Sequence, residues 1–311
     1  MTAVVATIPV PRPPRRVAVA PGGTRAYVTL DEPGGAGGVA VLDTEAHAVR
    51  ATLDAGRPAG IAVPADGTSV LVAALTADAA RTVVLVLDPE TGAVRATIPV
   101  AGRGGAPTGL AVLPGGERAV VACERELAAT EEQGTACVVG LAAGAVEARI
   151  AVGPFPAAVA ATPDGREVYV LDTAGDPAVI DTATLERSFP FGSAPTGHRI
   201  AFVPDGSLAY AILDADTQIN VLDPGTHALR HVLPASGLTT DVAVTPDGSA
   251  VYVTQRTRHQ LSVLRSGVVA PPEHPVAWAG TADGIAIAPD GRTAYVADRQ
   301  ACAVRVVALG G

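Results

Sequence analysis

The chain has 311 residues, a formal net charge of −9, and 48% hydrophobic but only 3% aromatic residues. The negative charge argues against nucleic-acid binding, because phosphates require clustered positive charge. No apolar run reaches the roughly 18 residues of a membrane-spanning helix, so no membrane span of that kind is predicted. All 22 basic residues are arginine, which excludes catalysis through a lysine Schiff base.

Residues 15–54 contain four short apolar segments separated by turn signals. The first segment ends before a turn at Gly23, the second begins at Tyr27, and the third ends at Asp43. A fourth segment closes the unit. Alternating apolar residues bounded by Gly, Pro and Asp predict antiparallel strands joined by tight turns.

The same unit recurs along the whole chain. By difference of their residue numbers, its turn glycines follow one another at intervals of 44, 49, 49, 41, 42 and 43 residues. Four short strands at such a period are typical of a β-propeller blade. We therefore predict an all-β, seven-bladed β-propeller of four-stranded antiparallel blades, forming one domain over residues 1–311. The predicted blades cover residues 15–54, 58–100, 107–152, 156–191, 197–234, 239–278 and 282–308.

The two ends of the chain complement each other. Residues 3–9 read like residues 93–99, which form the fourth strand of blade two, whereas the chain ends after the third strand of blade seven, residues 302–308. We predict that residues 3–9 supply the missing outer strand of blade seven. This pairing would close the ring and remove a free sheet edge, which is an aggregation liability.

The turns and second strands also carry a family resemblance. Pro-Asp-Gly precedes strands that begin Tyr-Val-Thr at Tyr252 and Tyr-Val-Ala at Tyr295, and third strands end in Asp-Thr at Asp43 or Asp-Pro at Asp223. This pattern resembles the YVTN β-propeller repeat family over nearly the whole chain. The resemblance implies the propeller fold. It leaves the activity open, because the family includes surface-layer, periplasmic and cytosolic proteins, and some similar propellers are lyases or lactonases.

Blade three and the cysteines bear on location and partners. Residues 124–134 are a polar insertion between the second and third strands of blade three, which predicts a short helix or a lid loop. Cys123, Cys137 and Cys302 are odd in number and scattered, which favours free thiols and a cytoplasmic protein. The first residues lack a charged segment followed by an apolar one, so no signal peptide is predicted.

Charged residues concentrate at the start of the innermost strands in four blades. Most blades have Gly, Ala or Thr there, whereas blades one, five, six and seven place Arg16, His198, Arg199, Asp241 and Asp283. These blades are neighbours in the predicted ring, so the charges should form one arc at the channel mouth, opposite an arc of small residues. Such a contrast suits a pocket for an amphipathic small molecule. The loops on the same face add Arg256 and Arg299.

These positions define the candidate site. We expect it to bind a small polar or anionic organic molecule, with His198, Asp241 and Asp283 as acid/base catalysts of a cyclase, lyase or isomerase type. Arg16 and Arg199 would bind a carboxylate or stabilise an enolate. The candidate substrate-binding residues are Arg16, Arg199, Phe155, Asp172, Gln255, His259 and Asp298.

Other readings stay open at this point. The charges could pair across blades as structural salt bridges, and His198, His259, Asp241 and Asp283 could hold a divalent metal ion. Phe155 could stack on a ligand or pack between blades. No nucleophile motif is present and no organic cofactor is predicted. The alternative function is a non-catalytic scaffold that binds a protein partner through its outer loops, in particular residues 124–134.

Overall fold

The structure is a computed structural model in which every regular element is a β-strand, and the strands form seven four-stranded antiparallel sheets. In each sheet that is continuous in sequence, the four strands follow one another in chain order. This is the blade topology of a β-propeller. The fold is therefore an all-β, seven-bladed β-propeller, as the sequence predicts. The structure describes residues 2–32, 35, 37–102, 104–124, 133–191, 197–212, 217–270, 273–278 and 280–310.

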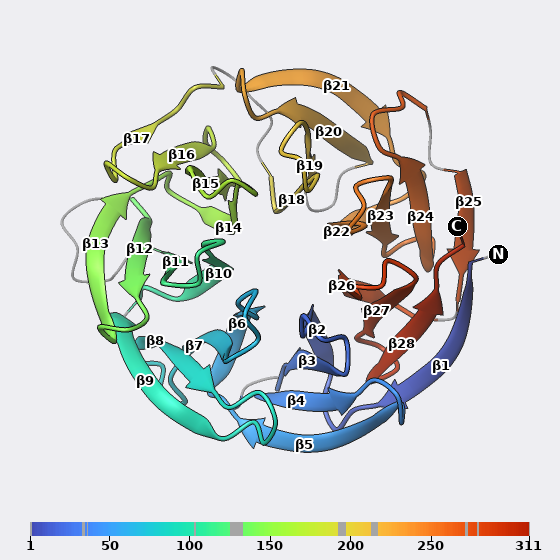
Figure 1. Ribbon diagram of the computed structural model, residues 1–311, viewed down its shortest axis with the longest axis horizontal. Coiled ribbons are helices and arrows are strands. Elements are labelled where there is room, and N and C mark those ends of the chain that lie inside the picture. Colours follow the sequence, from blue (N-terminus) through green and yellow to red (C-terminus); the bar gives the residue numbers. More distant parts are fainter. Residues whose placement is uncertain are drawn as a thin grey trace. The chain divides into compact units, whose positions relative to one another are not determined.

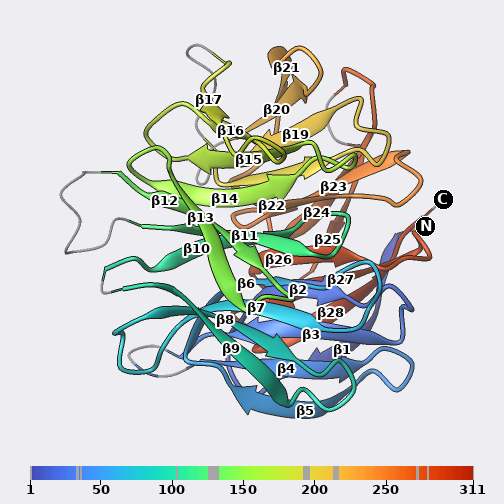
Figure 2. The same cartoon turned by 60° about the vertical axis from the view of Figure 1, so that its left-hand side comes forward.

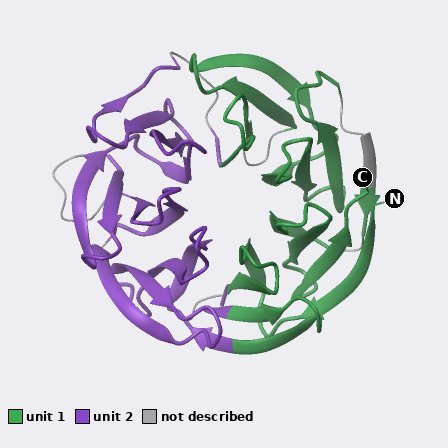
Figure 3. Cartoon of the chain, in the orientation of Figure 1, with its two compact units in different colours: residues 1–30, 40–51, 199–311 green, residues 31–39, 52–198 purple. Residues whose placement is uncertain are grey.

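The chain divides into two compact units, which are coloured separately in Figure 3. Unit 1 contains residues 1–30, 40–51 and 199–311, and unit 2 contains residues 31–39 and 52–198. Unit 1 holds blades five, six and seven and most of blade one. Unit 2 holds blades two, three and four.

The blades of unit 1 pack through their first strands. Strand β2 lies against β26, β26 lies against β22, and β22 lies against β18. The bounds of blade one are β2 (Pro14–Val19), β3 (Arg25–Leu30), β4 (Gly38–Asp43) and β5 (Ala48–Asp54). Those of blade five are β18 (Arg199–Phe202), β19 (Ala209–Ile212), β20 (Gln218–Asp223) and β21 (Ala228–Pro234). Those of blade six are β22 (Thr239–Val244), β23 (Ala250–Gln255), β24 (Gln260–Arg265) and β25 (Glu273–Ala277).

Blade seven is completed by the N-terminal strand. Its strands are β26 (Ala282–Ile287), β27 (Thr293–Asp298), β28 (Ala303–Ala308) and β1 (Ala3–Pro9), and Figures 1 and 2 show β1 alongside β28. The pairing runs from Ala3 opposite Ala308 to Pro9 opposite Ala303. Ile8 is fully buried in the core that blades seven and one share. The predicted closure is therefore confirmed.

The first strands of unit 2 also pack in sequence, β6 against β10 and β10 against β14. Blade two consists of β6 (Arg57–Ala62), β7 (Val70–Leu75), β8 (Thr82–Leu87) and β9 (Val94–Ala101). Blade three consists of β10 (Pro107–Val112), β11 (Arg118–Cys123), β12 (Thr135–Gly140) and β13 (Ala145–Ala151). Blade four consists of β14 (Pro156–Ala161), β15 (Glu167–Asp172), β16 (Ala178–Asp181) and β17 (Arg187–Ser188). Most of the insertion predicted at 124–134, residues 125–132, lies outside the described residues.

Small residues at the start of the first strands have a packing role. A Cβ atom on Gly60 would lie 2.9 Å from the backbone nitrogen of Leu110, and one on Gly109 would lie 3.0 Å from that of Val159. Neighbouring first strands therefore approach too closely for a side chain at these points. The small-residue arc that the sequence suggested as a pocket wall is explained by this close approach of backbones.

The repeated aspartates shape the turns. In blade six, the amide of Gly248, at φ +72°, donates to the carbonyl of Thr245, and the Asp247 carboxylate accepts from the amide of Ser249. In blade two, the Asp88 carboxylate after the third strand accepts from two backbone amides and pairs with Arg95 on the fourth strand. These contacts explain why Asp and Gly recur at fixed places in each repeat.

Candidate functional site

Local backbone irregularities set the direction of the charged side chains in unit 1. The pairing of β22 with β23 shifts register between Thr239 and Asp241, and that of β26 with β27 shifts between Ala282 and Ile285. A similar shift in β2 lies between Pro14 and Val17. Bulges of this kind re-aim side chains and occur often beside active sites. Here they carry Arg16, Asp241 and Asp283.

Asp241 is the buried centre of the arrangement. Its Oδ1 accepts from its neighbour Val242 N at 3.0 Å, and its Oδ2 accepts from Ile285 N in blade seven at 3.1 Å. Arg16 Nη1 lies 3.6 Å from Oδ2, and Arg199 Nε lies 3.8 Å from Oδ1. One carboxylate therefore joins the starts of the first strands of four blades.

Asp283 is the second carboxylate of the arrangement, and its arginine partners are more accessible to solvent than those of Asp241. Its Oδ1 accepts from Arg256 Nη2 at 2.9 Å, and its Oδ2 accepts from Arg299 Nη1 at 3.5 Å. Arg256 comes from the turn after β23 and Arg299 from the turn after β27. Both arginine side chains are well exposed, at 48% and 39% of their surface, whereas the Asp283 side chain is buried. Solvent therefore reaches the guanidinium groups but not the carboxylate.

We name these residues the acid–arginine cluster: Arg16, Arg199, Asp241, Arg256, Asp283 and Arg299. Each of its two carboxylates is contacted by two guanidinium groups, and the four arginines come from four blades. Burial raises the pKa of Asp241 above its usual value of 3.8, and the charge on Asp283 adds to this, while Arg16 and the two backbone amides oppose it. Asp241 therefore stays protonated to a higher pH than an exposed aspartate does.

The two predicted histidines are placed differently. His198 is half-buried, directly precedes β18 and belongs to unit 2. His259 is exposed in the turn between β23 and β24, and its Nδ1 lies 2.5 Å from the carbonyl oxygen of Gly280. Among the described residues there is no group of three or more His, Cys, Asp or Glu that could hold a metal ion.

The predicted binding residues at the ends of second strands make internal contacts. Asp298 is fully buried, accepts from the amides of Thr281 and Ala301, and pairs with Arg305 through Oδ2. Gln255 is fully buried and accepts from the hydroxyl of Ser236 at 2.8 Å. These two side chains hold neighbouring segments of unit 1 together.

Asp172 plays the same part in unit 2. It is buried and accepts from the amides of Phe155, Ala174 and Gly175 at 2.7 to 2.8 Å. The side chain of Phe155 is 59% exposed, so packing of this ring between blades is ruled out. The sequence could not separate these roles, because a carboxylate that orders a loop and one that binds substrate occupy the same position.

Arg256 and Arg299 were not among the predicted site residues, although the sequence analysis placed their loops on the same face as the charged starts of the innermost strands. The only sequence signal was their position directly after a second strand. The pairing across blades also matches the structural alternative, since Asp241 and Asp283 both contact arginines from other blades.

Comparisons with known proteins support the fold but do not assign a family or an activity. The chain is similar in structure to hydrazine synthase from Kuenenia stuttgartiensis. The two chains share 18% sequence identity over 97% of each, with a TM-score of 0.77. At this identity the likeness extends to the propeller fold alone. No protein-family model matches the chain, and no curated protein matches it in sequence.

Within the part of the chain that the structure describes, no helix has the length and apolar character needed to cross a bilayer. The three cysteines all lie within this part and form no disulfide with one another.

Proposed function

We propose that the acid–arginine cluster binds a small organic anion and that Asp241 exchanges a proton with it. The observation that carries this proposal is that two solvent-exposed arginines, Arg256 and Arg299, converge on the buried carboxylate of Asp283, in the same cluster as Asp241. Arginine presents a planar fork of donors that suits carboxylates and similar anions. An incoming anion would reach the two exposed guanidinium groups from the solvent side.

The chemistry available is acid/base catalysis without an organic cofactor. A carboxyl group whose pKa is raised by burial is a competent proton donor closer to neutral pH. The flanking arginines would stabilise negative charge that develops on the bound molecule, as in an enolate. In an elimination or isomerisation, the ionised Asp241 carboxylate would take up the proton whose removal forms the enolate, and the protonated carboxyl group would then return that proton to the product or leaving group. His198, predicted to share this role, stays a candidate in unit 2.

Two broader assignments accompany this proposal. We assign the chain to the YVTN repeat family on its Pro-Asp-Gly turns and the tyrosines that follow them, all of which are buried. We assign it to the cytoplasm because its cysteines are not joined in disulfides.

The test compares two arginines that are equally exposed. Arg256 and Arg50 side chains each expose 48% of their surface and each pairs with an aspartate, but only Arg256 belongs to the cluster. Succinate binding is measured by calorimetry for the native chain, Arg256→Ala and Arg50→Ala. Loss of a charge-assisted hydrogen bond should weaken binding by about tenfold or more in Arg256→Ala.

Arg50→Ala should bind succinate as the native chain does. Succinamide, the uncharged analogue of succinate, should not bind to any of the three proteins. Equal affinity of Arg256→Ala and Arg50→Ala for succinate would show that the cluster is a structural salt-bridge network, and the proposal would fail.

A further inference from the structure

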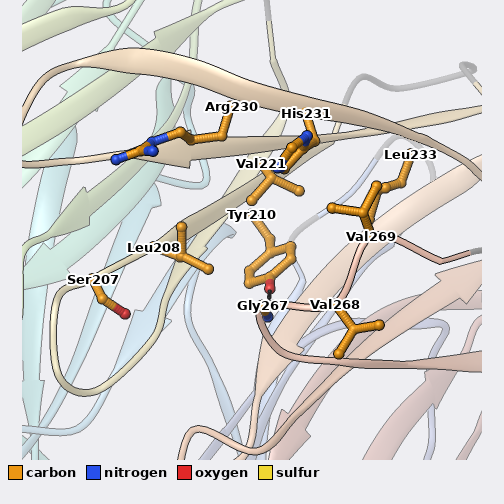
Figure 4. Close-up of a pocket in the computed structure, with 10 residues that line it drawn as sticks. All are labelled: Ser207, Leu208, Tyr210, Val221, Arg230, His231, Leu233, Gly267, Val268 and Val269. Atoms are coloured by element: carbon orange, nitrogen blue, oxygen red, sulfur yellow. Dashed lines mark hydrogen bonds between the residues drawn. The ribbon is translucent and has the colours of Figure 1, made fainter.

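A separate cavity of about 310 Å³ lies in unit 1, between blade five and the segment that follows β24 in blade six. Figure 4 shows the ten residues around it. None of them belongs to the acid–arginine cluster. The lining residues are Ser207, Leu208, Tyr210, Val221, Arg230, His231, Leu233, Gly267, Val268 and Val269.

The cavity follows from a short outer strand in blade six. Strand β25 pairs with β24 only from Gln260 to Val263, so the last two residues of β24 have no partner in β25. The chain instead turns at Gly267, where φ is +73°, and its amide donates to the hydroxyl of Tyr210 at 2.9 Å (Figure 4). The segment after β24 is thereby held against blade five, beyond the point where β25 stops pairing with β24.

The lining is mostly apolar. Leu208, Val221 and Leu233 come from blade five, and Val268 and Val269 come from the segment after β24. Val268 and Val269 are 48% and 60% exposed, which is unusual for adjacent valines that line a hollow. Burying these side chains against an apolar molecule would remove that surface from water, which is favourable.

Three of the four polar side chains of the lining are already engaged, and the fourth, His231, lies exposed on β21. The Tyr210 hydroxyl accepts the Gly267 amide, and the Ser207 hydroxyl donates to Asp205 at 2.6 Å. Arg230 donates to the Asp223 carboxylate through Nε at 2.9 Å and through Nη2, so its charge is balanced. A charged ligand would find no uncompensated counter-charge in these contacts. The cavity is therefore suited to an uncharged molecule.

The volume limits the size of that molecule. A dry apolar cavity of about 150 Å³ holds one benzene ring, so 310 Å³ accommodates roughly two fused rings. We propose that this cavity binds a small, uncharged, apolar or aromatic molecule of about ten carbon atoms. This would be a second site on the propeller, independent of the proposed anion site.

The test uses aminonaphthalene, a two-ring compound that is uncharged at neutral pH and whose fluorescence emission moves to shorter wavelength in apolar surroundings. The native chain should give a saturable shift. Val269→Asp and Val268→Asp should each weaken binding by about tenfold or more, because a carboxylate facing an apolar ligand must lose water. Both valines are exposed, so the substitutions should leave the fold intact.

Val5→Asp is the matched control. Val5 is 58% exposed on β1 and lies outside the cavity, so this variant should bind aminonaphthalene as the native chain does. Arg256→Ala should also bind normally, which separates this site from the anion site. The proposal is overturned if the native chain shows no saturable shift, or if all three Asp variants bind equally.

The oligomeric state of the protein provides a second test of the small-molecule proposal. Sedimentation should show that the native chain and Val269→Asp have the same mass in solution. A native dimer that Val269→Asp dissociates would show that the apolar hollow is an interface between two copies of the chain, and the small-molecule proposal would be wrong.

Discussion

Asp241, Asp298 and Asp247 have three different surroundings, although each is an aspartate in or beside a strand. Asp241 is buried between arginines that lie 3.6 and 3.8 Å away, and burial raises its pKa. Asp298 is buried but pairs closely with Arg305 at 2.9 Å. Asp247 lies in an exposed turn, where the Thr245 hydroxyl and then the Ser249 amide lower its pKa to about 2. Because its pKa is raised whereas that of Asp247 is lowered, Asp241 is the better candidate for proton exchange.

The pH dependence of unfolding tests this difference. Because the pKa of Asp241 is raised in the folded state, the stability that its protonated form contributes is fully present below 3.8 and is lost as the pH rises through the folded pKa. Asp241→Asn stays uncharged, so its free energy of unfolding should rise relative to the native chain as the pH increases above about 4. Chemical denaturation at several pH values measures this.

Asp247→Asn should behave in the opposite way. The pKa of Asp247 is lowered from 3.8 to about 2, so the stability contributed by its charged form is present above 3.8 and is lost as the pH falls through about 2. This variant should be less stable than the native chain at neutral pH and approach it in acid. Stability curves of the native chain and Asp241→Asn that run parallel to each other would contradict the assignment of Asp241.

Asp298 should be required for folding stability. Asp298→Ala leaves two backbone amides and Arg305 without this acceptor, and removing one partner of a buried ion pair typically costs about 3–5 kcal/mol. Asp290→Ala is the control, because Asp290 also accepts from two backbone amides but lies in an exposed turn. Its loss should cost about 1 kcal/mol in urea unfolding. If Asp298→Ala and Asp290→Ala lowered the free energy of unfolding by similar amounts, Asp298 would not have the structural role assigned to it.

At the scale of the strand, two features define unit 1. The N-terminal strand covers the outer edge of β28, and bulges at the start of β2, β22 and β26 direct the charged side chains. Both depend on short stretches of sequence that are far apart in the chain. They can be tested separately from the site chemistry.

The N-terminal strand should contribute strongly to stability. Ile8 is fully buried, so Ile8→Ala should cost about 2–5 kcal/mol of the free energy of unfolding. Val5 on the same strand is exposed, and Val5→Ala should change stability by no more than about 0.5 kcal/mol. Deletion of residues 1–9 should lower the melting temperature sharply. An unchanged melting temperature after that deletion would mean that β1 does not close blade seven.

Gly284 should tolerate no side chain. It lies between Asp283 and Ile285, and a Cβ atom there would collide with the backbone carbonyl oxygen of Arg15 on β2. Gly284→Ala should destabilise the protein by about 1–3 kcal/mol and weaken succinate binding, because β26 must move away from β2. Gly22→Ala, where a Cβ atom would meet open space, should do neither. Equal stability of the two variants would argue against this close packing.

At the scale of the whole molecule, the sequence predicts the fold better than the site. The turn spacing and the complementary ends are sufficient for seven blades and the closure by residues 3–9, because each repeat encodes its own strands and turns. The gathering of Arg16, Arg199, Asp241 and Asp283 also follows from blade order. Whether the carboxylate of Asp298 faces a ligand or a neighbouring loop depends on backbone amides that no residue pattern reveals.

Two further features could not be derived from the sequence pattern. The pairing of Arg256 and Arg299 with Asp283 depends on side chains that reach across neighbouring turns. The apolar cavity depends on how far β25 extends along β24, which the spacing of apolar residues does not determine. Both arise from contacts between segments rather than from the pattern within one segment.

The central claim is that an organic anion binds beside Asp241, and the most direct measurement is the pKa of that carboxyl group with and without a bound anion. The carboxyl carbon shift of Asp241 is followed by NMR across the acidic range, with and without saturating ethanedisulfonate, whose ionisation does not change over that range. A negative charge bound in the acid–arginine cluster should raise the pKa of Asp241 further and leave that of Asp247 at about 2. Identical titration curves for Asp241 in the two conditions would contradict the proposed anion site.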